Sequence, residues 1–150
     1  MSAKKHILFV DDEPNILQGI KRSLIGCARE WDMYFVCGGS EALEAMAKTP
    51  FDVVVSDMRM PGMDGAALLE KVRQLYPQTA RIALSGHSEQ EMVLRAVGPT
   101  HQYLSKPCKP ELLRSTIARA CALRERLTSP ELQRVITGMP CLPSLPSLYL

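Results

Sequence analysis

The chain has 150 residues, of which 46% are hydrophobic, and this suits one ordinary domain with a short appendage. Its formal net charge is +2, and no basic block indicates direct binding to nucleic acid. The five cysteines are odd in number and form no C-x-x-C pair, which argues against zinc or a disulfide framework and favours reduced thiols. The first apolar run is too short for a signal peptide or a membrane span, so we expect a cytoplasmic protein.

Short runs of β-forming residues alternate with longer segments whose apolar residues recur every three or four positions. This alternation is typical of a parallel sheet with helical crossovers. We expect strands at residues 6–10, 33–36, 53–57, 80–85 and 102–104. We expect helices at residues 14–26, 41–48, 66–76, 89–97 and 110–127. Right-handed crossovers then predict an α/β fold, with a doubly wound five-stranded parallel sheet of the flavodoxin-like type and strand order 2-1-3-4-5.

Local signals predict how some of these elements begin and which faces they bury. Pro14 suits the first turn of the first helix, and Ser40 is the expected N-cap of the second. The third strand consists of small or β-forming residues before Asp57, so we expect it to be central and buried on both faces. The apolar stripe of the first helix is expected at Ile16, Leu17, Ile20, Leu24 and Ile25.

Residues 5–127 are therefore expected to form one domain, and residues 128–150 differ from it. Ser129-Pro130 restarts a short helix, after which Pro140, Pro143 and Pro146 interrupt leucines in a way that a sixth β/α repeat would not tolerate. We interpret this segment as a helical linker and the truncated start of another domain, or else as a proline-rich linker.

Charged and polar residues stand at the ends of the predicted strands. Asp11 and Asp12 follow the first strand, Asp57 ends the third, Ser85 ends the fourth, and Lys106 follows the fifth. Because the carboxyl ends of parallel strands meet at one edge of a sheet, where open α/β folds bind their ligands, we expect these side chains to converge. Such a set suits a hard metal ion and a phosphoryl group.

Each motif also has a purely structural interpretation. Asp11-Asp12-Glu13-Pro14 could be an acidic N-cap, Asp57 could start a turn, and Lys106 could be a solvated lysine before a loop. Viewed singly, the structural and functional interpretations stand roughly level. Independent capping or turn roles give no reason for all of these residues to fall at strand ends, so their joint placement favours a common site.

The charges predict what this site binds. Two carboxylates about 4 Å apart repel by about 4 kcal/mol at an effective dielectric near 20, so Asp11, Asp12 and Asp57 should bind a cation or take up protons. Oxygen ligands favour Mg²⁺ or Mn²⁺, and such an ion is usually held by one or two carboxylates plus a phosphate. The third carboxylate is then left to attack phosphorus. Lys106 and the Ser85 hydroxyl would offset the charge on the phosphoryl oxygens.

This set, with Met60-Pro61-Gly62-Met63-Asp64-Gly65 after the central acid, closely resembles the receiver domain of two-component response regulators over about residues 5–127. The resemblance implies that Asp57 is the phosphoacceptor. It also implies that Asp12 and Asp57 contact Mg²⁺, and that Asp11 orients a metal-bound water. Finally, it implies that the backbone carbonyl of Arg59 is a further ligand.

The same resemblance assigns roles to the later residues. Lys106 would pair with the phosphoryl group, and the peptide bond before Pro107 would be cis. Ser85 and Tyr103 would form the switch, and moving it from about 1:99 to 99:1 needs about 5.5 kcal/mol. Tyr103 has a structural alternative, an edge-strand tyrosine half buried against the last helix.

The resemblance further implies the partners. The phosphoryl donor would be a sensor histidine kinase or a phosphotransfer protein, and the domain would catalyse only its own phosphorylation and dephosphorylation. Residues 142–149 resemble the opening of the HD-related output domain that follows some receivers, so an output domain would continue the full-length protein. A homodimer promoted by phosphorylation would use Met92, Val93, Tyr103 and the face of residues 111–126. No membrane contact is expected.

Two further residues are expected to affect how long the phosphoryl group survives. Arg59 and His87 lie two residues beyond Asp57 and Ser85, where receivers place side chains over the phosphoryl group. The alternative for His87 is a solvated loop histidine. The segment between Ser85 and Lys106 is slightly shorter than in many receivers, which affects the fourth helix.

Three rival functions remain open from the sequence. A pseudo-receiver would keep the fold without accepting phosphate, although the intact acids and lysine argue against it. A magnesium-dependent phosphatase with an aspartyl intermediate would need a second aspartate two residues after Asp57, where Arg59 stands. A nucleotide-binding domain is disfavoured because no G-x-G-x-x-G or P-loop pattern follows any strand.

Overall fold

The computed structural model describes residues 4–85, 102–106 and 108–127. The expected helix at 89–97, the residues His87, Met92, Val93 and Pro107, and the segment 128–150 lie outside the described residues. Among the helices that are described, none combines the length and apolar character needed to cross a bilayer.

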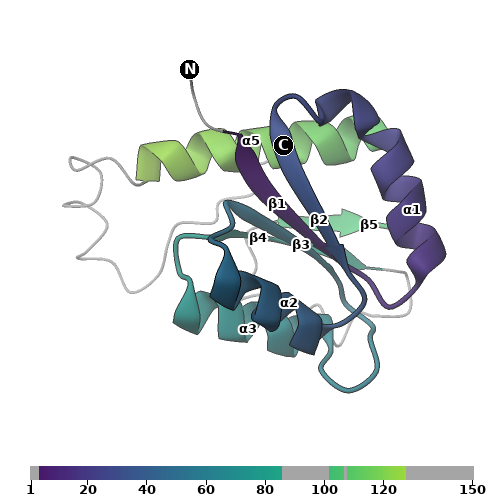
Figure 1. The fold of residues 1–150 in the computed structure, drawn as a ribbon, viewed down its shortest axis with the longest axis vertical. Helices are drawn as coiled ribbons and strands as arrows, with labels where there is room; N and C mark the ends of the chain where they lie inside the picture. The colour runs from purple at the N-terminus through teal and green to yellow at the C-terminus, as the bar shows by residue number, and fades with distance from the viewer. Residues whose placement is uncertain (1–3, 86–101, 107, 128–150) are drawn as a thin grey trace.

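Five strands form one parallel sheet in the order β2-β1-β3-β4-β5, as predicted (Figure 1). The strands are β1 (Lys5–Val10), β2 (Trp31–Val36), β3 (Val53–Asp57), β4 (Ala80–Ser85) and β5 (Gln102–Ser105). The helices are α1 (Pro14–Ser23), α2 (Gly39–Lys48), α3 (Gly65–Leu75) and α5 (Pro110–Leu127), with a 3₁₀ turn η1 (Ile25–Cys27) after α1. The expected doubly wound α/β architecture is confirmed.

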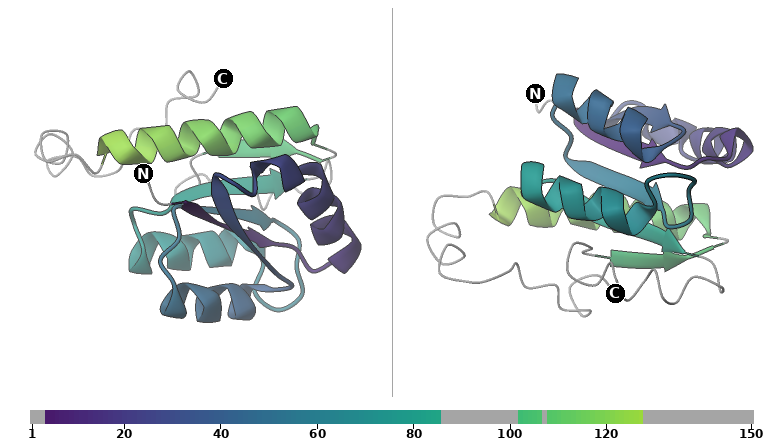
Figure 2. Two further views of the ribbon diagram at one scale, coloured as in Figure 1. Left: turned by 45° about the horizontal axis from the view of Figure 1, so that its top comes forward. Right: turned by 90° about the horizontal axis from the view of Figure 1, so that it is seen from below.

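The helices cover the two faces of the sheet as separate layers (Figure 2). Helices α1 and α5 bury residues such as Leu17 and Ile117 against one face, while α2 and α3 bury residues such as Met46 and Leu69 against the other. All five residues of β3 are buried, as expected for a central parallel strand between two helical layers. The sheet therefore carries apolar cores on both faces.

The buried stripe of the first helical segment differs from the prediction. Leu17 and Leu24 are buried, but Ile16 and Ile25 are 37% and 70% exposed. Helix α1 ends at Ser23 rather than near Gly26, and the chain continues as the 3₁₀ turn, whose tighter winding changes which residues face the sheet. Cys27 is buried in this turn and belongs to the same apolar cluster as Leu17 and Leu24.

The start of the second helix also differs. Gly38 is the N-cap residue of α2, so the prediction of Ser40 as the cap is wrong. A carboxylate oxygen of Glu41 lies only 2.5 Å from where a Cβ on Gly38 would stand, so the third helical residue folds back over the cap. Strand β2 begins at Trp31, two residues before its expected start, because the buried Trp31 side chain anchors this end.

The connection from β3 to α3 is built around three turn residues. Gly62 has a φ of 76°, which with the preceding Pro61 suits a type II turn. Asp64 caps α3, since its Oδ1 accepts a hydrogen bond of 2.9 Å from the backbone nitrogen of Ala67. A Cβ on Gly65 would collide with the carbonyl oxygen of Asp57 and lie 2.8 Å from the Cα of Met58. Only glycine lets α3 start this close to the end of β3.

Replacing Gly65 with alanine should therefore destabilise the domain by roughly 1–3 kcal/mol, because backbone atoms rather than a flexible side chain obstruct the new methyl group. Gly19→Ala is the matched control. No atom lies within 4 Å of the added Cβ in α1, so this variant should gain about 0.5–1 kcal/mol. Urea unfolding monitored by circular dichroism measures both values, and equal stabilities of the two variants would contradict the close approach.

Candidate functional site

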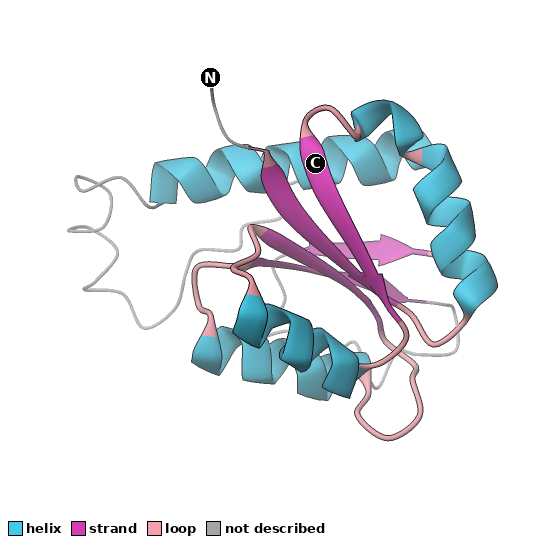
Figure 3. Cartoon of the chain, in the orientation of Figure 1, coloured by secondary structure: helices cyan, strands magenta, loops and turns pink. Residues whose placement is uncertain are grey.

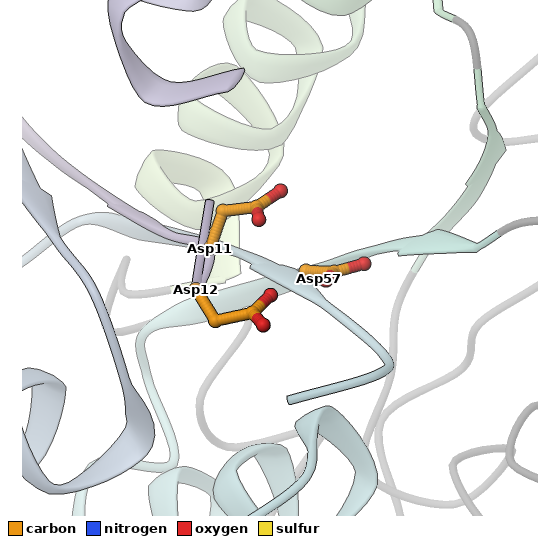
Figure 4. A group of neighbouring side chains, drawn as sticks. All are labelled: Asp11, Asp12 and Asp57. Carbon is orange, nitrogen blue, oxygen red and sulfur yellow. The ribbon is translucent and has the colours of Figure 1, made fainter. Parts of the chain in front are cut away.

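Three aspartates meet at the carboxyl edge of the sheet. Asp11 and Asp12 directly follow β1, and Asp57 is the last residue of the neighbouring β3, where Val10 pairs with Ser56. One carboxylate oxygen from each lies within 4.8 Å of the others, and the side chains project into the same space (Figure 4). The strand pairing thus brings together residues that are far apart in sequence.

The three carboxylates differ in burial. Asp11 and Asp57 are 1% and 4% exposed, whereas Asp12 is half-buried. Asp11 is held by a hydrogen bond of 3.0 Å from the backbone nitrogen of Glu13 to its Oδ1. The N-cap residue of α1 is Glu13, which makes no side-chain cap bond, and Pro14 occupies the first turn. The acidic N-cap followed by proline, which the structural alternative expected, is therefore present, but the cap residue is Glu13, and Asp11 and Asp12 precede it.

Lys106, which directly follows the last residue of β5, joins the acidic cluster. Its Nζ lies 2.7 Å from Oδ1 of Asp57 and 3.2 Å from Oδ2 of Asp11. Its backbone nitrogen donates a hydrogen bond of 2.8 Å to the carbonyl oxygen of Ser85, which fixes the start of the lysine side chain. The interpretation of Lys106 as merely a solvated lysine is thereby wrong.

The pKa of Lys106 follows from these contacts. Burial lowers the pKa, but the hydrogen bond to Asp57 and the charges of Asp11 and Asp57 outweigh burial and hold the pKa above the ordinary lysine value. A raised pKa means that the ion pairs stabilise the fold fully below the ordinary lysine pKa, and that this contribution is lost only as pH rises through the raised value. The ammonium is consequently charged throughout the neutral range.

The remaining expected site residues lie around this cluster. Ser85 is the last residue of β4, pairs with Ser105 and is half-buried. The preceding residue, Leu84, accepts a hydrogen bond of 3.1 Å at its carbonyl oxygen from the backbone nitrogen of Met58. Arg59 is exposed immediately after the fully buried Met58. This loop therefore leaves the sheet directly beside the carboxylates.

Tyr103 lies deeper in the sheet than Ser85. It pairs with Ala83 on β4 and packs, partly buried, against the apolar cluster that includes Ala83 and Met58. This cluster belongs to the α2 and α3 layer, so the alternative that placed Tyr103 against the last helix is wrong. Alternation along β5 explains the error, because Leu104 rather than Tyr103 contributes to the core beneath α5.

Sequence reasoning missed two residues that position Asp57. The buried Ser56 hydroxyl donates a hydrogen bond of 2.9 Å to the carbonyl oxygen of Asp57. Gly65 lies against the same carbonyl group and also donates from its nitrogen to the carbonyl oxygen of Met58 at 2.9 Å. The Asp64-Gly65 dipeptide signalled a turn, but nothing in the sequence signalled its contact with the central acid.

The curated relatives of this chain include transcriptional regulators. The DNA-binding transcriptional regulator NtrC of Escherichia coli K12 is 36% identical over 121 residues, which cover 80% of this chain and 24% of NtrC. The hydrogenase transcriptional regulatory protein HoxA of Cupriavidus necator is 32% identical over 116 residues, covering 76% of this chain and 23% of HoxA. The chain thus spans about a quarter of the length of these relatives.

Solved structures of similar fold include receiver domains. The signal receiver domain of an HD domain-containing protein from Pseudomonas fluorescens Pf-5 has a TM-score of 0.78 and 30% identity, covering 83% of this chain and 99% of that one. A response regulator receiver domain protein from Clostridium thermocellum has a TM-score of 0.75 and 29% identity, with 83% and 99% covered. The family model for the response regulator receiver domain matches residues 7–118. The chain therefore belongs to the receiver domain family of two-component response regulators.

Proposed function

We propose that this domain accepts a phosphoryl group on Asp57 from a sensor histidine kinase or a phosphotransfer protein. The single observation that supports this most directly is the Lys106 ammonium 2.7 Å from the Asp57 carboxylate, within a cluster of three acids. An ion pair of this kind neutralises charge at the acceptor before the donor arrives and at the phosphoryl oxygens afterwards. A structural ion pair alone would not need the two further carboxylates of Asp11 and Asp12.

The acidic cluster fits a hard divalent cation. Three carboxylates and one ammonium leave an excess of negative charge, and oxygen ligands of this spacing suit Mg²⁺ or Mn²⁺. We assign Asp12, Asp57 and the backbone carbonyl of Arg59 as ligands, with Asp11 orienting the hydration shell. A bound cation would supply positive charge next to the transferring phosphoryl group.

In the transfer step, a carboxylate oxygen of Asp57 attacks phosphorus, the P–N bond to the donor histidine breaks, and a P–O bond to Asp57 forms. The electron pair of the broken bond returns to the histidine ring, which takes up a proton. Hydrolysis reverses the modification, because water attacks the same phosphorus and restores the carboxylate. Lys106 keeps its charge in both directions, since its raised pKa places deprotonation far above neutral pH.

The signal would leave the site through β4 and β5. The phosphoryl oxygens offer new acceptors beside the Ser85 hydroxyl. On the neighbouring strand β5, Tyr103 is partly buried two residues before Ser105, which pairs with Ser85. We infer that Ser85 moves towards the phosphoryl group and that Tyr103 repacks in response. Several charge-assisted hydrogen bonds together can supply much of the about 5.5 kcal/mol that a nearly complete switch requires.

The full-length protein is expected to carry an output domain. The chain spans about a quarter of its curated relatives, and one structural neighbour is the receiver of an HD domain-containing protein. We propose that residues 128–150 lead into an HD-related output domain, whose activity the receiver controls.

The phosphoacceptor assignment predicts that Asp57→Asn abolishes labelling. Incubated with Mg²⁺ and acetyl phosphate, the wild-type chain should gain the mass of one phosphoryl group in a form that is stable in acid and labile in base. The control is Asp52→Asn, at the opposite edge of the sheet, where Asp52 accepts a hydrogen bond from His6 N at 2.8 Å. A wild-type chain that stays unmodified would identify a pseudo-receiver instead.

The metal assignment predicts that Mg²⁺ stabilises the wild-type chain but not Asp12→Asn. Without divalent cations, Asp12→Asn should be more stable than wild type by about 1 kcal/mol, because one repelling carboxylate is removed from a half-solvated position. With Mg²⁺ at a hundred times its dissociation constant, the wild-type chain alone should gain about 2.7 kcal/mol. Thermal unfolding measures this, and an equal gain in Asp12→Asn would argue against the assigned ligands.

The exposed Arg59 should affect the lifetime of the phosphorylated state. Removing this side chain in Arg59→Ala should speed the loss of the phosphoryl group by about tenfold, which corresponds to about 1.4 kcal/mol in the hydrolysis barrier. Labelling itself should persist, because the proposed metal ligand is a backbone carbonyl. Lys71→Ala, an exposed cation on α3, is the control. Decay followed by mass spectrometry tests this, and identical half-lives would remove the idea.

A further inference from the structure

Strand β2 is the end strand of the sheet, and within the described part of the chain no strand pairs with its outer edge. Figure 3 shows it along its full length at the outside of the sheet. Its sequence, Trp31-Asp32-Met33-Tyr34-Phe35-Val36, contains one charged residue and no proline. Natural proteins usually protect such edges with lysine, proline, a bulge or a covering segment. This edge therefore has the character of an interaction surface.

The backbone of β2 presents a regular set of hydrogen-bonding groups at that edge. Lys5 N donates to Glu30 O at 3.1 Å and Asp11 N donates to Val36 O at 3.2 Å, so the even-numbered residues of β2 face β1. Because backbone direction alternates along a strand, the N–H and C=O groups of Trp31, Met33 and Phe35 face outward. These three residues can pair with another extended strand.

The side chains beside the edge are compatible with such a pairing. The single charge, Asp32, forms an ion pair with Lys4 at 3.7 Å, and its other carboxylate oxygen lies 3.5 Å from Nε2 of His6. Tyr34 is 39% exposed and packs edge to face on Phe51, with ring centroids 5.0 Å apart. The two rings contribute to a pocket of about 350 Å³ between β2 and α2. An added strand would find apolar surface next to it.

We propose that β2 pairs antiparallel with β2 of a second copy of this chain, about a two-fold axis through Met33. In this register Trp31 pairs with Phe35 of the second copy, and Met33 pairs with its own counterpart, so every outward backbone group finds a partner. Tyr34 then lies opposite Asp32 of the second copy. Centring the axis on Asp32 instead would pair only two outward residues from each chain and set two aspartates face to face.

A second copy suits the edge better than an unrelated extended segment, because the strand is self-complementary in both respects. All three outward positions are matched, and the one charged residue, Asp32, lies opposite Tyr34 rather than a like charge. The edge lies on the side of the sheet away from β4 and β5, where the proposed switch residues are. The dimer is therefore constitutive and independent of phosphorylation at Asp57.

Sedimentation velocity of the whole chain, without a phosphodonor and over a range of concentrations, tests the proposal. The wild-type chain should dimerise. Tyr34→Asp places a carboxylate opposite Asp32 of the second copy at two symmetric positions, and should raise the dimer dissociation constant by about tenfold. Tyr34→Lys loses the same ring but places an ammonium there, and should retain the dimer. A monomeric wild-type chain, or equal effects of the two variants, would overturn the proposal.

A backbone variant tests the ladder itself. In Met33→Pro the lost N–H faces outward, so the pairing of β2 with β1 is retained while the central hydrogen bonds of the dimer are lost. This variant should sediment as a monomer and still be phosphorylated on Asp57, which shows that it is folded and separates this proposal from the phosphoacceptor assignment. If it folds and remains dimeric, the β2 pairing is wrong. A folded, monomeric Met33→Pro would support the β2 pairing, as would a weakened dimer in Tyr34→Asp.

Discussion

The contact between the Lys106 ammonium and the carboxylates of Asp57 and Asp11 is the interaction on which the rest of the structure depends. Lys106 and Asp11 are 95 positions apart in the sequence, and they meet only because β1 and β3 are neighbours and β5 closes the same side of the sheet. Without the ammonium, the three carboxylates would repel one another, and each pair about 4 Å apart would contribute as much as about 4 kcal/mol. The strand order is thus a requirement of the site as much as a consequence of packing.

The fold offsets the cost of concentrating charge with cores on both faces of the sheet. The three residues preceding Ser56 and Asp57 in β3 are fully buried apolar side chains, so the strand that carries the central acid is anchored over its whole length. Backbone contacts then fix the acid itself, since the Ser56 hydroxyl binds its carbonyl oxygen and Gly65 packs against the same group. Asp57 is therefore positioned through its main chain, which leaves its carboxylate to interact with Lys106.

The sequence predicted the strand order and the converging residues because both follow from strong patterns. Five β/α repeats admit few right-handed topologies, and acids at strand ends are visible without coordinates. The misplaced details depend on local geometry that periodicity does not encode. The helix α1 ends before Ile25, which is exposed in the 3₁₀ turn, and Gly38 displaces Ser40 as the cap because Glu41 folds back over it. The alternative that placed Tyr103 against the last helix is wrong because a short edge strand gives too few residues to fix its alternation from the sequence.

Backbone hydrogen bonds connect the site to the strands on either side of it, to β4 and β5 on one side and to β2 on the other. On one side, Met58 N binds Leu84 O and Lys106 N binds Ser85 O, so the loops that follow β3, β4 and β5 are joined directly beside the carboxylates. On the other side, β2 reaches the site through the bond from Asp11 N to Val36 O. If Asp57 is phosphorylated as proposed, the change in charge acts first on Ser85 and Lys106 and on the strand that carries Tyr103. The outer edge of β2 is the part of the sheet least coupled to that change, which makes a permanent contact there compatible with a reversible signal on the opposite side.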